Sequence, residues 1–151
     1  QYAFLTGVRD KLSEIHKAIR EVREVRGQLD TLVARAGDGE AAKPLVERAK
    51  KLGESTKAIE EKLYQTKNRS EQDPLNFPIR LNDKLAGVYQ VASFGDNPPT
   101  ASAIAVRAEL TARIDAELAA LAKLMAEELP AVNEAARTAA LPFVAPSPAK
   151  E

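Results

Sequence analysis

The residues that could carry chemistry are few in this sequence of 151 residues. It contains no cysteine and a single histidine, His16. The absence of cysteine excludes disulfides, thiolate metal sites and cysteine nucleophiles. A di-iron helical bundle would need Glu-x-x-His on two helices, which one histidine cannot supply. Because His16 follows Ile15, a residue of an apolar stripe, we interpret it as a histidine at the border of a helix core.

The acidic and glycine-rich motifs do not predict catalysis either. Glu60 and Glu61 are adjacent, as are Glu127 and Glu128, and adjacent residues of a helix point about 100° apart. Such pairs do not place two carboxylates together. The segment 37–43, Gly-Asp-Gly-Glu-Ala-Ala-Lys, lacks the spacing of a phosphate-binding loop and follows no strand, so it is expected to be a turn between helices.

Composition narrows the class of protein further. The chain has 22 basic and 22 acidic residues, and this balance argues against a dedicated nucleic-acid-binding protein. No apolar run approaches the roughly 18 to 20 residues that a transmembrane helix needs. We therefore predict a protein without enzymatic activity, cofactor or metal site. The absence of cysteine is compatible with a reducing cytoplasm and with secretion.

The first segment has the periodicity of a long amphipathic helix. Apolar residues recur at steps of three and four, with charged residues between them, which is the pattern of one apolar helix face. This stripe consists of Leu5, Val8, Leu12, Ile15, Ile19, Val22, Val25, Leu29 and Leu32. We expect the helix to end near Ala36. At 1.5 Å per residue it would be about 50 Å long, so other helices must cover its stripe.

A second helix is expected after a glycine-rich break. Gly37 is placed to end the first helix in the left-handed conformation, and Pro44 suits the first turn of the next. The apolar stripe of the second helix consists of Leu45, Ala49, Leu52, Ile59 and Leu63. We expect this helix to last until about Arg69 or Ser70.

Two further helices complete the pattern. A third, shorter helix is expected from about Pro78 to a stop at 95–99, and Thr100 is a natural N-cap for a fourth. Pro130 should either kink the fourth helix or begin a short final one through Ala140. Their predicted apolar stripes are Ile79, Leu81, Leu85, Val88 and Val91 in the third, and Ile104, Leu110, Ile114, Leu118, Leu121, Met125 and Leu129 in the fourth.

Four amphipathic helices with short connections and no strand pattern predict an all-α fold. We expect an antiparallel up-down-up-down four-helix bundle over residues 1–140, with helices of unequal length. Residues 141–151 contain three prolines and are expected to form an extended or disordered tail. A bundle with ragged ends should leave apolar side chains exposed, which would provide a surface for a partner.

The corner between the second and third helices is where we would look first for a site. Pro74 and Pro78 prevent a continuous helix, and nearby amide side chains could bond to the backbone groups that the prolines leave unpaired. We favour a structural corner over a ligand site. The candidate residues are Asn68, Asp73, Pro74, Asn76, Phe77, Pro78 and Asn82.

Three motifs in this region carry a family resemblance. They are Leu-Tyr-Gln-Thr-Lys-Asn at 63–68, Gln-Asp-Pro-Leu-Asn-Phe-Pro-Ile at 72–79 and Leu-Asn at 81–82. The sequence here resembles the helical C-terminal region of large bacterial proteins built from Asp-box β-propellers of the sialidase or sortilin type. Shorter pieces of the first and last helices agree in the same order, so the resemblance spans most of the chain.

The resemblance implies that a propeller precedes Gln1 and that the protein is secreted or belongs to the cell envelope. The catalytic residues of a sialidase would lie in the propeller, so no catalytic residue is transferred to this chain. For the seven corner residues the resemblance implies a structural role. The sequence itself leaves a cytoplasmic location open.

These observations favour a non-catalytic helical module that packs on the propeller or on another protein. Two alternatives remain at this point. One is a module that binds a small ligand or a glycan at the corner from Asp73 to Asn82. The other is a free-standing coiled-coil adaptor in which the first helix pairs with a helix of a partner.

Overall fold

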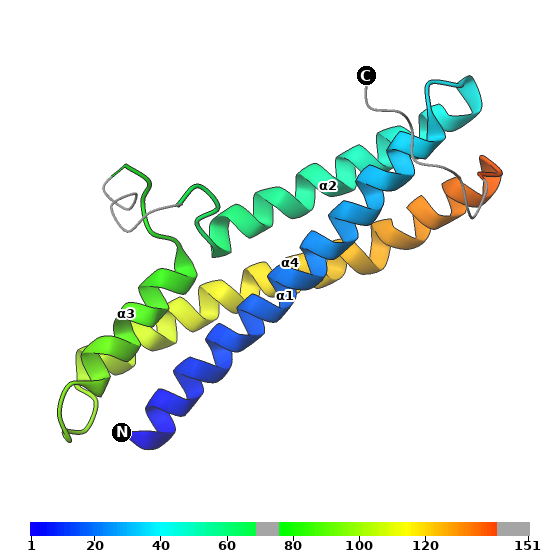
Figure 1. The fold of residues 1–151 in the computed structure, drawn as a ribbon. Helices are drawn as coiled ribbons and strands as arrows, with labels where there is room; N and C mark the ends of the chain where they lie inside the picture. Colours follow the sequence, from blue (N-terminus) through cyan, green and yellow to red (C-terminus); the bar gives the residue numbers. More distant parts are fainter. Residues whose placement is uncertain (69–75, 142–151) are drawn as a thin grey trace. The chain divides into compact units, whose positions relative to one another are not determined.

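A computed structural model describes residues 1–68 and 76–141 (Figure 1). It contains four α-helices, which are α1 (Tyr2–Ala36), α2 (Lys43–Leu63), α3 (Leu81–Ser93) and α4 (Ala101–Thr138). A short 3-10 helix, η1 (Glu40–Ala42), precedes α2. The described residues form no strand, so the predicted all-α fold with four helices is confirmed. The predicted tail lies outside the described residues, apart from Leu141.

Several local signals act as predicted. Gly37 adopts a φ of 64° directly after α1, in the left-handed region that glycine enters without strain. Pro44 lies in the first turn of α2, where its missing N–H has no helical partner to lose. Thr100 caps α4, because its Oγ1 accepts a hydrogen bond of 3.1 Å from the amide of Ala103.

The predicted end of the second helix, near residue 69 or 70, is wrong. Helix α2 ends at Leu63. The side chain of Gln65 then bonds to the amide of Lys67 and to the carbonyl of Pro78. The predicted start of the third helix at about Pro78 is also early by three residues. Asp83 accepts a hydrogen bond from the amide of Arg80, which makes Arg80 the N-cap of α3.

Pro130 does not divide the last helix. It lies inside α4, which continues to Thr138. Its side chain is exposed, so the carbonyl that loses a helical partner four residues earlier can be hydrated.

The helices contribute to two compact units. Unit 1 comprises Gln1–Arg20 and Ala58–Ala120, and unit 2 comprises Glu21–Lys57 and the described part of Leu121–Glu151. Helices α1, α2 and α4 each supply residues to both units, whereas α3 belongs to unit 1. The prediction of one domain over residues 1–140 stays a prediction.

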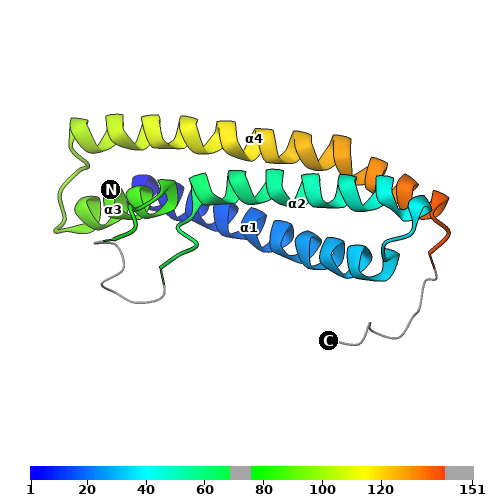
Figure 2. The ribbon, with the colours of Figure 1, turned by 90° about the horizontal axis from the view of Figure 1, so that it is seen from above.

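The directions of the helices in unit 1 differ from the predicted up-down-up-down order. Nε2 of Gln1 donates to the carbonyl of Ala92 at 2.9 Å, so the start of α1 lies beside the end of α3. Nζ of Lys11 bonds to Asp115 at 2.7 Å, while the guanidinium of Arg107 lies over the ring of Phe4. Helix α3 is therefore antiparallel to α1, and α4 is parallel to α1 (Figure 2).

The reason for this difference is the length of the stripe on α1. Helix α2 has 21 residues and contributes only its last turns to unit 1, whereas α1 has 35 residues. Helix α3 covers the part of α1 that begins at Phe4. Helix α3 runs toward Gln1 and ends beside it. Helix α4 starts from that end of unit 1 and therefore runs in the direction of α1.

Each unit has its own hydrophobic core. In unit 1 the buried cluster consists of Phe4, Val8, Ile15, Ile19, Leu63, Leu81, Leu85, Val88, Ala92, Leu110 and Ile114. In unit 2 it consists of Leu29, Leu45, Ala49, Leu52 and Val132. Three residues of the predicted stripes are exposed, since Ile79, Val91 and Ile104 have between 45% and 71% of their surface accessible.

Candidate functional site

The corner between α2 and α3 is held together by the side chain of Gln65. Its Nε2 donates to the carbonyl of Pro78 at 2.8 Å, and its Oε1 accepts from the amide of Lys67 at 3.2 Å. Gln65 is buried, with 6% of its surface exposed. Both ends of this amide are therefore used by the backbone, which is the behaviour of a structural corner.

The asparagines of the corner lie in different surroundings. Asn82 is buried and Asn68 is half-buried, and the Oδ1 atom of each is inaccessible and accepts no hydrogen bond from the described residues. Asn76 is exposed. Gln65 therefore forms the predicted hydrogen bonds to the backbone. The Oδ1 atoms of Asn68 and Asn82 form no such bond with the described residues. Asp73 and Pro74 lie outside the described residues.

Phe77 and Pro78 complete the described part of the corner. Phe77 is half-buried, and the ammonium of Lys67 lies 5.7 Å from the centre of its ring, within reach of a cation–π interaction. Pro78 is exposed and contributes its carbonyl to Gln65. The structure thus brings Gln65, Lys67, Phe77 and Pro78 together, and a recognition role for this corner stays a prediction.

His16 and Glu60 are the two residues that most resemble catalytic groups, and they differ in exposure. His16 is exposed, and its ring meets the ring of Tyr64 edge to face at 6.4 Å between centroids. Glu60 is 3% exposed and has a polar partner. No sequence pattern predicts this burial, because the adjacent Glu61 has the same side chain, and Glu61 is only half-buried.

An interhelical ion pair crosses unit 1. Nζ of Lys11 bonds to Asp115 at 2.7 Å and to Glu14 at 2.5 Å, and its side chain is 19% exposed. Burial alone would lower the pKa of Lys11, but the hydrogen bonds to Asp115 and Glu14 outweigh it and raise this pKa above its ordinary value of 10.5. Lys11 therefore stays charged and joins α1 to α4.

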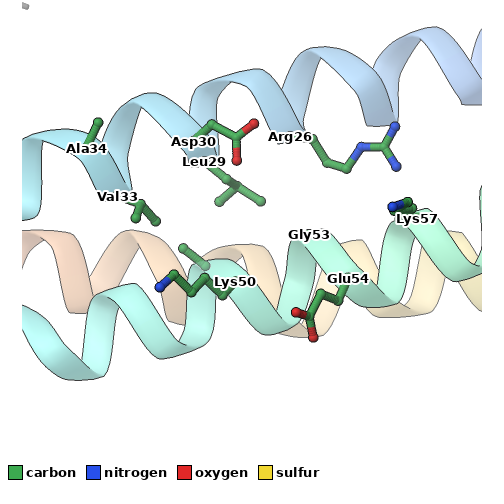
Figure 3. A pocket seen from close by; sticks show the side chains of 10 residues that line it. Arg26, Leu29, Asp30, Val33, Ala34, Lys50, Gly53, Glu54 and Lys57 are labelled. Atoms are coloured by element: carbon green, nitrogen blue, oxygen red, sulfur yellow. The ribbon is translucent and has the colours of Figure 1, made fainter. Parts of the chain in front are cut away.

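Unit 2 has a groove of about 480 Å³ between α1 and α2 (Figure 3). Its walls include Leu29, Val33 and Ala49, and small residues such as Gly53 leave it open. The charged residues that line it are Arg26, Asp30, Lys50, Glu54 and Lys57. Because three cations alternate with two carboxylates, the groove favours no single ligand charge.

One end of unit 1 gathers exposed apolar side chains. Of the seven large hydrophobic residues that are exposed in the described chain, six come from the start of α1, the end of α3 and the start of α4. They are Tyr2, Tyr89, Val91, Phe94, Ile104 and Val106, which together we call the apolar end. Phe94 is 92% exposed and Tyr2 is 83% exposed.

Contacts between the three helices show that these residues share one end of unit 1. The side chain of Gln1 donates to the carbonyls of Ala92 and Gly95, at 2.9 and 2.6 Å. The guanidinium of Arg107 lies 4.8 Å from the centre of the Phe4 ring. The start of α1 therefore meets both the end of α3 and the start of α4.

The described residues contain no group of three or more potential metal ligands. Among them, no helix combines the length and the hydropathy that a membrane span requires. Comparisons of the chain with protein-family models, with curated proteins and with solved structures find no match.

Proposed function

We propose that this chain is a non-catalytic helical interaction module whose apolar end packs against another protein domain. The observation that supports it most is the concentration of six exposed large apolar residues at one end of unit 1. Single exposed apolar residues are common on soluble proteins, but a group of them at one place is typical of an interaction surface.

The energetic argument favours a covered surface. Burying a large apolar side chain that was exposed contributes about 1.5–3 kcal/mol. Phe94 follows the last residue of α3 and is almost fully outside the core, since 92% of its surface is accessible. An aromatic residue in this position contributes little to the fold of the chain itself. It would contribute substantially to a complex.

The family resemblance suggests the partner, a β-propeller that precedes this chain. Gln1 lies at the apolar end, where its side chain is tied to the carbonyls of Ala92 and Gly95. A domain joined ahead of Gln1 would therefore emerge beside Tyr2 and Phe94. This proximity would give the propeller a high effective concentration at the apolar end.

Cysteine accessibility tests this proposal, because the chain has no cysteine of its own. We would compare the alkylation rate of Phe94→Cys in residues 1–151 alone and in the whole polypeptide that the gene encodes. We expect modification to be at least about tenfold slower in the whole polypeptide, since a covered thiol must wait for the contact to open.

Lys51→Cys provides the control, because Lys51 is an exposed residue of α2 in unit 2. Its rate should be the same in both proteins. Equal rates for Phe94→Cys in both proteins would contradict the proposed contact. So would a gene that encodes no propeller ahead of Gln1.

Two further parts of the proposal have direct tests. Purified residues 1–151 should not turn over aryl glycosides or peptides, and measured turnover that survives repurification would disprove a non-catalytic role. The resemblance also suggests a secreted or envelope-associated bacterial protein. Fractionation of the native cells should then find the protein outside the cytoplasm.

A further inference from the structure

A second surface of unit 1 carries a strong local charge. It is a groove of about 310 Å³ where the end of α2, the start of α3 and the middle of α4 meet. Of the described residues that line it, four are basic, namely Lys62, Arg80, Lys84 and Arg113, and one is acidic, Glu117. The described part of its lining therefore has an excess of three positive charges, in a chain whose formal net charge is zero.

Glu117 does not neutralise the four basic residues of this lining. Nζ of Lys62 bonds to both oxygens of Glu117, at 3.0 and 3.1 Å, so this acid is already engaged. Arg113 is 3.6 Å from Glu109, and both side chains are more than half exposed, which makes a weak pair. Neither Arg80 nor Lys84 forms an ion pair with another described residue.

The position of Arg80 and Lys84 is unfavourable for folding. Arg80 is the N-cap of α3, and Lys84 lies at the fourth position of this helix. Near the N-terminus of a helix the helix dipole favours negative charge. Asp83 offers partial relief, because its carboxylate accepts from the amide of Arg80 at 3.3 Å. A feature that opposes stability locally is typical of a binding site.

We propose that this groove binds a phosphoanion, whose oxygens are held by the side chains of Arg80, Lys84 and Arg113. A phosphoryl group carries about −1.5 to −2 charges at pH 7 and three acceptor oxygens, and arginine binds such groups in a bidentate geometry. An anion with two phosphoryl groups matches the excess charge of the groove. This inference does not depend on a contact at the apolar end.

Titration with inorganic pyrophosphate tests the site. We expect the backbone amide resonances of Arg80, Lys84 and Arg113 to shift with one saturating dissociation constant, in the millimolar range or below. Arg80→Gln should weaken binding about tenfold, because one charge-assisted pair is lost. Arg48→Gln removes the same charge from an exposed position in unit 2 and should weaken it less than about twofold.

Lys84→Glu makes the test sharper because two effects have opposite signs. This variant should abolish pyrophosphate binding while raising the melting temperature by about 1–4 °C, since it replaces a cation near the N-terminus of α3 by an anion. Lys84→Gln should show both effects at smaller size. A structural role for Lys84 would instead lower the melting temperature in both variants.

A second ligand identifies the source of the phosphoryl groups. Equal affinities for pyrophosphate and ADP would support recognition of the phosphates alone. Tighter binding of ADP would support a nucleotide whose base contacts Ile79, which lines the groove and is 45% exposed. The proposal is overturned if neither ligand shifts these resonances up to about 10 mM. It is also overturned if Arg48→Gln weakens binding as much as Arg80→Gln does.

Discussion

The two compact units are built from the same three long helices but bury different kinds of side chain. In unit 1 one of the eleven buried core residues is an alanine, and the others are larger. In unit 2 the buried core has five residues including Ala49, and four of the partly buried residues around it are alanines. Alanine stabilises helices but contributes little apolar area.

This difference shows how one helix can serve two packing arrangements along its length. In unit 1, α3 adds Leu81, Leu85 and Val88 to the cover of α1 and α4, and the core closes around large side chains. In unit 2, α1 and α2 leave the groove beside Gly53 open. We therefore expect unit 1 to be the more tightly packed of the two.

Truncation of one core residue in each unit should have the largest effect. Ile15→Ala should lower the free energy of unfolding by about 3–5 kcal/mol, and Leu52→Ala by about 2–3 kcal/mol. Both side chains are fully buried, but the small residues around Leu52 should allow the cavity to collapse further. Urea denaturation of both variants measures this difference, with exposed Lys51→Ala as the control. An equal or larger loss for Leu52→Ala would refute the contrast in packing.

The corner of unit 1 should respond next. Gln65→Ala should cost about 1–3 kcal/mol, because the carbonyl of Pro78 and the amide of Lys67 both lose their partner. The matched variant is Gln28→Ala, since Gln28 is an exposed glutamine of α1 in unit 2. It should change the unfolding free energy by less than about 0.5 kcal/mol. Similar values for the two variants would show that the corner bonds add no stability.

Removal of the interhelical ion pair should have a smaller effect that depends on pH. Lys11→Met should cost about 1 kcal/mol at pH 7. Folding raises the pKa of Lys11 above its ordinary value of 10.5, so this contribution is complete below that pH and is lost as the pH rises through the folded-state pKa. The difference between wild type and Lys11→Met should therefore shrink in alkaline solution.

Lys123→Met is the corresponding variant of unit 2. Lys123 lies 3.9 Å from Glu127 and is 75% exposed, so its removal should have almost no effect at any pH. Thermal denaturation between neutral and strongly alkaline pH measures both variants. If the Lys11→Met difference grew with pH, our assignment of the raised pKa would be wrong.

Glycine substitutions should give the smallest effects, with opposite signs in the two units. Gly53→Ala should stabilise the protein by about 0.5–1 kcal/mol, because a Cβ there meets no atom within 4 Å. A Cβ on Gly7 would lie 2.3 Å from Nη2 of Arg107, so the guanidinium would have to leave the ring of Phe4. We expect Gly7→Ala to bring no gain or a small loss. A clear gain at Gly7 would mean that the contact between Arg107 and Phe4 contributes nothing.

Local signals in the sequence were sufficient to predict the four helices and most of the residues on their buried faces. The stripe of α1 contains Val8, Ile15, Ile19 and Leu29, and all four are buried. Gly37, Pro44 and Thr100 mark helix ends as expected, because capping depends on backbone geometry within a few residues. Helix α2 ended early for a reason that no local pattern contains, a bond between Gln65 and Pro78, thirteen residues apart.

The sequence by itself determined that the chain is helical, where each helix has its apolar face and that no cysteine chemistry is available. The tertiary structure decided the directions of α3 and α4, the exposure of Val91 and Ile104, and the gathering of basic residues from three helices in one groove. Periodicity reports which side of a helix avoids water. It does not report which other helix covers that side, because this depends on the relative lengths of the helices and on contacts between residues far apart in the chain.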